Sequence, residues 1–287
     1  MLKDPEFIRK LEMLSLLARK MLGGKLKADR KTTKKGSGIN FADYAEYSFG
    51  DDYRSVDWNI YARLEQLVVK LFEVEEDSAI FVMLDMSPSM RKKQEHSKKI
   101  AAALSYIALN SLDRLAVYGV ADALNPIFPM SHGRGKIFTM LDAVEKASIF
   151  GSDTDFNGAF KNFRAINKKP GICVVISDFF DPGGISKTLD YLMWAKNDVF
   201  CIQVLAPDEM KCDLHGDVEL ECVETGARRN ITASPIEAKK YEKEIMAWNE
   251  SIRKECARRG VGYIQAFTDI PFEDIIQNVL RRGGLVA

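Results

Sequence analysis

Carboxylates and hydroxyls gather at the ends of predicted strands and in one loop before a predicted helix. Their oxygen atoms are hard ligands, which suit Mg²⁺ or Mn²⁺ and suit Zn²⁺ poorly. The residue types therefore predict a magnesium or manganese site, provided that the fold brings the three loops together. The residues are Asp85, Ser87 and Ser89 after the apolar run 79–84, Thr154 before a predicted helix at 156–166, and Asp178 after the apolar run 171–177.

The elements that must position these loops alternate along the chain. Apolar runs that indicate buried strands are separated by segments with the periodicity of helices. This alternation predicts a doubly wound, mostly parallel α/β sheet with helices on both faces. Ligands bind outside the carboxyl ends of the strands in such sheets, so the three loops are expected to meet at one edge. The predicted strands are 79–84, 115–121, 171–177, 199–205 and 261–266.

The pattern Asp-x-Ser-x-Ser after an apolar strand resembles the metal-ion-dependent adhesion site of von Willebrand factor A domains. The resemblance implies that Asp85, Ser87 and Ser89 form the first part of the site, Thr154 the second and Asp178 the third. The third part, Ser177-Asp178-Phe179, has Phe where many such sites have Gly. The alternative is that these serines and Asp178 only cap helices.

The segment upstream of the first predicted strand carries a more specific resemblance. GSGINFADYAEYSFGDDYRSVDWNIYAR, followed by DMSPSM, ISDF and ETG, is similar to the bacterial domain-of-unknown-function family fifty-eight. The resemblance covers about residues 36–283 and implies a von Willebrand factor A-like core. It also implies a MoxR-type AAA+ ATPase as partner in the maturation or activation of other complexes. The matching positions of the extension include Gly50, Asp51, Arg54, Asp57, Trp58 and Arg63.

Two interpretations fit the charged residues of the DDYRSVDWN stretch. The three aspartates with Arg54 could form a carboxylate site. We favour a buried Arg–Asp network that ties the segment to the core, because charge-assisted pairs of this kind fix geometry. Trp58 and Tyr61 would then anchor the packing.

Charge is segregated along the chain although the 287 residues have a formal net charge of zero. Residues 1–35 carry 11 basic and 4 acidic groups, residues 36–78 carry 3 and 10, and the remainder is balanced. We expect a basic helical arm and linker at 1–35 and an acidic, aromatic extension packed on the core at 36–78. The von Willebrand factor A-like domain would occupy 79–287, with a hairpin insertion near 207–233.

Composition excludes several classes of protein. A balanced charge argues against a dedicated nucleic-acid binder, and no apolar run approaches the roughly 20 residues of a membrane span. The N-terminal sequence lacks the uninterrupted apolar core of a signal peptide. Five cysteines without a CxxC spacing indicate reduced, structural thiols and a cytoplasmic protein.

The function predicted from these residues is a metal-dependent protein-interaction module without catalytic activity. Hydroxyl ligands do not neutralise a divalent cation, so a bound cation would attract a carboxylate from a partner. One alternative is a structural adaptor with an empty metal site. A second is a metal-dependent hydrolase, although an enzyme of the haloacid dehalogenase type needs a second acid where Ser87 stands.

Overall fold

The computed structural model describes most of the chain in two compact units. One unit comprises Met1–Met21 and Ala79–Ala287, and the other comprises Leu22–Ser78. The described residues are 1–22, 31–35, 40–75, 79–151, 156–167, 170–181, 183–194, 196–211, 216–222 and 226–281.

The larger unit is built on a six-stranded sheet with the order β11-β8-β7-β4-β5-β6. Neighbouring strands are parallel except β5 and β6, which form an antiparallel pair at one edge. The predicted doubly wound, mostly parallel α/β sheet is therefore confirmed. The strands are β4 (Ala79–Asp85), β5 (Arg114–Val120), β6 (Leu124–His132), β7 (Ile172–Ser177), β8 (Asp198–Leu205) and β11 (Gly262–Phe267).

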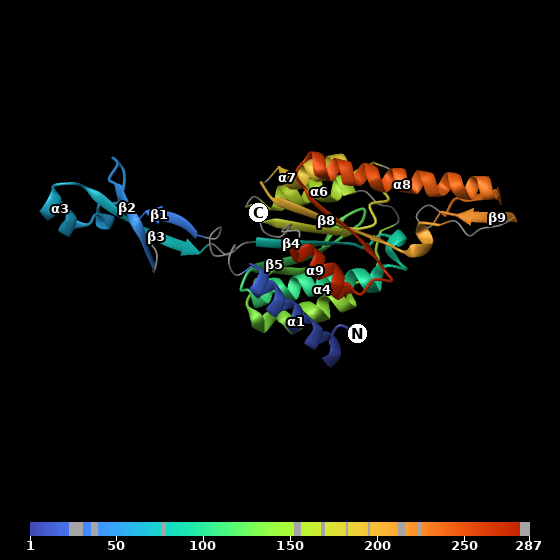
Figure 1. Cartoon of the computed structure of the whole chain (residues 1–287), viewed down its shortest axis with the longest axis horizontal. Coiled ribbons are helices and arrows are strands. Elements are labelled where there is room, and N and C mark those ends of the chain that lie inside the picture. The colour runs from blue at the N-terminus through green and yellow to red at the C-terminus, as the bar shows by residue number, and fades with distance from the viewer. Residues whose placement is uncertain are drawn as a thin grey trace. The chain divides into compact units, whose positions relative to one another are not determined.

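Helices cover both faces of this sheet, as Figure 1 shows. Three helices lie on one face: α6 (Phe156–Ile166), α7 (Ile185–Met193) and α8 (Pro235–Arg258). Helices α1 (Pro5–Leu22), α4 (Gln94–Asn110), α5 (Ile137–Lys146) and α9 (Phe272–Arg281) lie on the other face. Because both faces are covered, β4 is buried along its whole length and reads as a continuous apolar run rather than an alternating one.

The core on the α6 side is dense in aromatic rings. Phe163 of α6 packs edge-on against Phe81 of β4, with ring centres 5.1 Å apart, and against Tyr118 of β5 at 5.9 Å. Edge-to-face pairs of this kind add stability beyond the area that they bury. Helix α6 is thereby fixed over the centre of the sheet.

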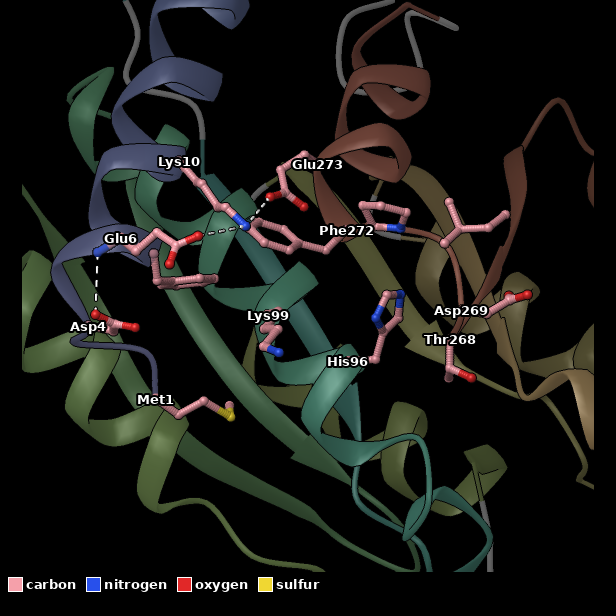
Figure 2. Close-up of a pocket in the computed structure, with 13 residues that line it drawn as sticks. Met1, Asp4, Glu6, Lys10, His96, Lys99, Thr268, Asp269, Phe272 and Glu273 are labelled. Atoms are coloured by element: carbon pink, nitrogen blue, oxygen red, sulfur yellow. Dashed lines mark hydrogen bonds and ion pairs between the residues drawn. The ribbon is translucent and has the colours of Figure 1, made fainter.

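Helix α1 is joined to the larger unit, although the segment Leu22–Ser78, assigned to the other unit, follows it in the chain before β4 begins. Phe7 packs against Phe272 of α9 with ring centres 5.2 Å apart, and Leu11 is fully buried. A cavity of about 570 Å³ lies beside this contact and is lined by residues of α1, α4 and the start of α9. Figure 2 shows Lys10 at its rim, between Glu6 and Glu273, with 2.8 Å separating Lys10 Nζ from Glu273 Oε1.

A hairpin interrupts the alternation of strands and helices before α8. Strands β9 (Gly216–Glu221) and β10 (Arg228–Ala233) form an antiparallel hairpin. Helix α8 begins with a capping box in which Ser234 and Glu237 exchange hydrogen bonds with each other's backbone N–H. The 3-10 turns of the chain are η1 (Tyr53–Ser55), η2 (Pro88–Met90), η3 (Arg134–Lys136) and η4 (Pro207–Glu209).

The smaller unit is a three-stranded antiparallel sheet with one short helix. The strand order is β1-β3-β2, with β1 at Lys31–Lys35, β2 at Asn40–Glu46 and β3 at Val68–Glu75. Helix α3 (Trp58–Leu64) lies in the connection between β2 and β3. Trp58 and Tyr61 contact each other edge-on at 6.0 Å between ring centres.

Asp57 organises the connection between β2 and β3. Its carboxylate accepts hydrogen bonds from the backbone N–H of Asn59, so that it caps α3, and from the hydroxyl of Tyr44. Asp57 forms an ion pair with Lys70, with 3.0 Å between Asp57 Oδ2 and Lys70 Nζ. This contact holds the pKa of the Asp57 carboxyl below its usual value. Arg54 is exposed to solvent, so the prediction of a buried Arg54–Asp network is wrong. The reason is the strand pairing, which aligns Tyr44 with Lys70 and so brings the Lys70 ammonium to Asp57.

The other positions singled out in the extension have local roles. Gly50 adopts a positive φ of 104°, a conformation that favours glycine, and Asp51 accepts a hydrogen bond from the backbone N–H of Ser48 at 2.8 Å. Arg63 is exposed on α3. No helix among the described residues of either unit has the length and apolar character needed to cross a membrane.

The burial of α1 generates a prediction for the full chain. Leu11→Ala should lower the free energy of unfolding by about 2–4 kcal/mol, because it leaves a cavity under α1. Leu16→Ala, on the exposed side of the same helix, should change it by less than about 0.5 kcal/mol. Urea unfolding of both variants measures the difference, and equal effects would show that α1 is not packed on this unit.

Candidate metal centre

The parallel pairing of β4 with β7 brings two aspartates to the same edge of the sheet. Leu84 is aligned with Ile176, so Asp85 at the end of β4 lies beside Ser177 at the end of β7. The Ser177 hydroxyl donates a hydrogen bond of 2.5 Å to Asp85 Oδ2. Asp178 follows directly, and both carboxylates are about 2% exposed.

The Asp-x-Ser-x-Ser loop folds back over the end of β4. The Ser87 backbone N–H donates to Asp85 Oδ1 at 2.9 Å, and the hydroxyls of Ser87 and Ser89 lie 3.1 Å apart. Pro88 stands in the first turn of η2, where its fixed φ suits the turn and its missing N–H costs nothing. Two hydroxyl oxygens are thus held next to the Asp85 carboxylate.

Asp178 is held by different partners. Its Oδ1 accepts a hydrogen bond from the Phe180 backbone N–H at 3.0 Å, and its Oδ2 lies 2.7 Å from Lys93 Nζ. The Lys93 ammonium is fully buried and also forms an ion pair with Glu209 of η4. Asp178 is therefore charge-compensated within the protein.

The turn between Asp178 and Phe180 adopts the conformation in which glycine is common. Phe179 has a φ of 59° although it is not glycine, and its side chain is buried. Its backbone N–H donates to the Ser177 hydroxyl at 2.8 Å, and that hydroxyl in turn donates to Asp85. Phe179 thus fills the position where many adhesion-type sites have glycine, at a cost of about 1–2 kcal/mol in backbone strain.

The two carboxylates, Asp85 and Asp178, differ in their electrostatic surroundings. Burial and the nearby charge of Asp178 raise the pKa of Asp85 to about 7. Burial by itself would lower the pKa of Lys93, but the carboxylates of Asp178 and Glu209 outweigh it and raise that pKa. Lys93 is thus a constant cation, whereas Asp85 is a buried carboxylate without an ion-pair partner among the described residues.

Four of the five predicted site residues meet at this edge: Asp85, Ser87, Ser89 and Asp178. Thr154 lies outside the described residues. The chain reaches the edge shortly before it, since the Phe150 backbone N–H donates to Met86 O at 3.1 Å.

Sequence reasoning missed Lys93, Glu209 and Ser177 as members of the site. Ser177 could have been found, because it is the last residue of a predicted strand and precedes Asp178. Lys93 lies in the ordinary-looking stretch RKKQ, and no local signal marks it as buried. Glu209 is 116 residues away from Lys93 along the chain, so only the tertiary structure pairs them.

The donor chemistry fits a hard divalent cation. Among the described residues no group of three or more His, Cys, Asp or Glu side chains could hold a metal ion. Asp85 with the Ser87 and Ser89 hydroxyls supplies carboxylate and hydroxyl oxygens, which suit Mg²⁺ or Mn²⁺. The buried charge of Asp85 is the feature that a cation would stabilise.

Comparison with known proteins identifies the family. The family described as "Protein of unknown function DUF58" matches residues 43–251. The chain belongs to this family. Proteins of Mycobacterium tuberculosis ("Uncharacterized protein Rv1480") and Mycobacterium bovis ("Uncharacterized protein Mb1516") are each 26% identical to this chain over 293 residues, covering 98% of it and 92% of their own length.

Solved structures with a similar fold are also found for this member of the DUF58 family. The conserved hypothetical protein BatB from Bacteroides thetaiotaomicron is 16% identical with a TM-score of 0.45, covering 71% of this chain and 98% of its own. A von Willebrand factor type A protein from Catenulispora acidiphila is 12% identical with a TM-score of 0.41, covering 76% of this chain and 44% of its own. These likenesses concern the fold alone.

The raised pKa of Asp85 generates a prediction about stability in chelator. Because the folded-state pKa of about 7 exceeds the unfolded value of roughly 3.9, the native state binds a proton more readily. The free energy of unfolding should therefore fall as pH rises from about 4 to about 7. Asp85→Asn removes this slope and should stabilise the metal-free protein by about 2 kcal/mol or more near pH 8.

Urea unfolding in chelator at about pH 5 and about pH 8 measures the slope. Asp208→Asn is the matched control, since Asp208 is an exposed carboxylate next to Glu209 in η4. The control should keep the wild-type slope, and an Asp85→Asn variant that also keeps it would contradict the assignment.

Proposed function

We propose that this DUF58 protein is a protein-interaction module whose Asp85 centre binds Mg²⁺ or Mn²⁺ and, with it, a carboxylate of a partner protein. The observation that carries the proposal is the buried carboxylate of Asp85, which lies beside two hydroxyls and pairs with no cation of the described chain. A bound divalent cation would supply a Lewis-acidic position open to an anionic oxygen.

The residues of the site have separate tasks in this proposal. Asp85 provides the negative charge, and Ser87 and Ser89 provide neutral oxygen ligands. Ser177 orients Asp85 by donating to its Oδ2, and the Ser87 backbone N–H holds Oδ1. With one uncompensated carboxylate and neutral hydroxyls, the described part of the site leaves much of a divalent charge unneutralised, which favours an anionic ligand from outside.

The proposed partner is an AAA+ ATPase of the MoxR type, with which the protein would mature or activate a client complex. Support for this partner comes from the family resemblance of the GDDYRSVDWN segment and the DMSPSM loop. We propose a cytoplasmic location, because Cys173, Cys201 and Cys256 are buried thiols of the kind that persist in a reducing compartment.

The proposal does not include catalysis. Two residues after Asp85 stands Ser87, whose hydroxyl cannot serve as the general acid that a haloacid dehalogenase-type reaction needs. His96 on α4 and His132 at the end of β6 share no hydrogen bond with the site among the described contacts. A purely structural adaptor with an empty site is the second candidate, favoured by the buried Lys93 cation that already compensates Asp178.

The test combines metal binding with partner capture. Asp85→Ala should abolish Mg²⁺ and Mn²⁺ binding in calorimetry and weaken capture of the cognate ATPase at least about tenfold, because one charge-assisted contact at the centre of an interface is lost. Asp208→Ala, which removes an exposed carboxylate nearby, should change neither measurement.

The outcomes separate the candidates. Equal capture by Asp85→Ala, and by the wild type in chelator, would establish the structural adaptor instead. Metal-dependent hydrolysis of p-nitrophenyl phosphate by the wild type, lost in Asp85→Ala, would establish a hydrolase.

A further inference from the structure

Lys93 is a fully buried cation next to the Asp85 centre. It stands between η2 and α4, where its backbone N–H donates to Met90 O and its carbonyl accepts from the Ser97 backbone N–H, both at 2.9 Å. Because Lys93 is fully buried, its side chain points inward rather than to solvent. A buried lysine is costly unless carboxylates compensate it.

Two carboxylates compensate the charge of Lys93, and they lie in the loops that follow two different strands. Asp178, after β7, lies 2.7 Å from Lys93 Nζ, and Glu209, after β8, forms the second ion pair. The ring of Phe180 completes the surroundings, with its centre 5.2 Å from the ammonium. The ammonium thus joins three loops at the carboxyl edge of the sheet.

Glu209 carries this connection further. Its second carboxylate oxygen accepts from the Ala206 backbone N–H at 2.8 Å, and its backbone carbonyl accepts from the Tyr241 hydroxyl of α8 at 2.8 Å. Lys93 is therefore linked to the first turns of α8, which follow the β9–β10 hairpin. Its loss would disturb Asp178 and this turn together.

We propose that Lys93 is the permanent internal cation of this site. It pairs with Asp178 and Glu209 and leaves Asp85 as the one carboxylate of the described site without a cation, and thereby keeps divalent-cation affinity low and the preference for an anionic ligand high. The inference rests on the proposed function in that Asp85 is taken as the metal ligand. Lys93 is a positioning and specificity-determining residue, since it acts through Asp178 and through its charge.

The sign of the effect follows from charge. A fixed positive charge near a divalent cation is repulsive, and the repulsion is strong where both are buried. Removing Lys93 also frees a carboxylate oxygen of Asp178. Both changes favour cation binding, whereas the added negative charge disfavours a carboxylate from outside.

The test compares four proteins by Mn²⁺ titration, with calorimetry and water-proton relaxation as readouts. Lys93→Met should bind Mn²⁺ at least about tenfold more tightly than the wild type. Lys93→Met/Asp178→Asn keeps the wild-type net charge of the cluster and should return to about wild-type affinity. Lys92→Met, which removes the exposed neighbouring lysine, should match the wild type.

Two further readouts report on the other parts of the proposal. In chelator, Lys93→Met should lower the thermal unfolding midpoint by about 5 °C or more, because it leaves buried carboxylates without their cation. Acetate added to the Mn²⁺-loaded protein should bind at least about fivefold more weakly to Lys93→Met than to the wild type.

Every outcome decides the inference. Unchanged or weaker Mn²⁺ affinity in Lys93→Met overturns it, even where the wild type binds Mn²⁺ through Asp85 and the proposed function holds. Tight binding by Lys93→Met with none by the wild type supports it and overturns the proposed function. If Lys93→Met does not fold, Asp178→Asn is compared with Lys93→Met/Asp178→Asn, and the double variant must bind Mn²⁺ at least about tenfold more tightly.

Discussion

The parallel pairing of β4 with β7 is the constraint on which the site depends. Their register sets Asp85 beside Ser177 and brings Asp178 to the same edge. The pairing is possible because both strands are buried on both faces and consist of apolar residues. A shift of one residue would turn Asp85 toward the opposite face of the sheet, so the apolar pattern of the core also determines where the carboxylate points.

Two buried carboxylates at one edge would repel each other, and the protein resolves this unequally. Asp178 pairs with the Lys93 cation, while Asp85 is hydrogen-bonded by the Ser177 hydroxyl and by Ser87 and has no cation among the described residues. The inequality is visible in the pKa of Asp85, which is raised to about 7 by burial and by the charge of Asp178. The ionised Asp85 carboxylate therefore destabilises the metal-free folded state, and Asp85 is the residue to which the proposed function assigns the metal. Such a trade-off between stability and function is common at functional sites.

Backbone strain occurs at the same edge. Phe179 adopts a left-handed conformation, and its N–H donates to the Ser177 hydroxyl that orients Asp85. The buried ring of Phe179 belongs to the core beneath α6 and α7, so packing compensates for a conformation that a smaller residue would adopt more easily. The turn after β7 is therefore determined jointly by the core and by the polar site.

The sequence by itself determined the larger sheet and most of the site. Continuous apolar runs separated by helical periodicity can only be buried in a parallel sheet covered on both faces, and residues that follow such strands must meet at its carboxyl edge. Only the tertiary structure decided the charge partners. Lys93 meets Asp178 and Glu209, and Asp57 meets Lys70 rather than Arg54, because strand register and turns bring together residues from different segments of the chain. Local patterns carry no information about such pairs, since an isolated Lys or Glu is most often exposed.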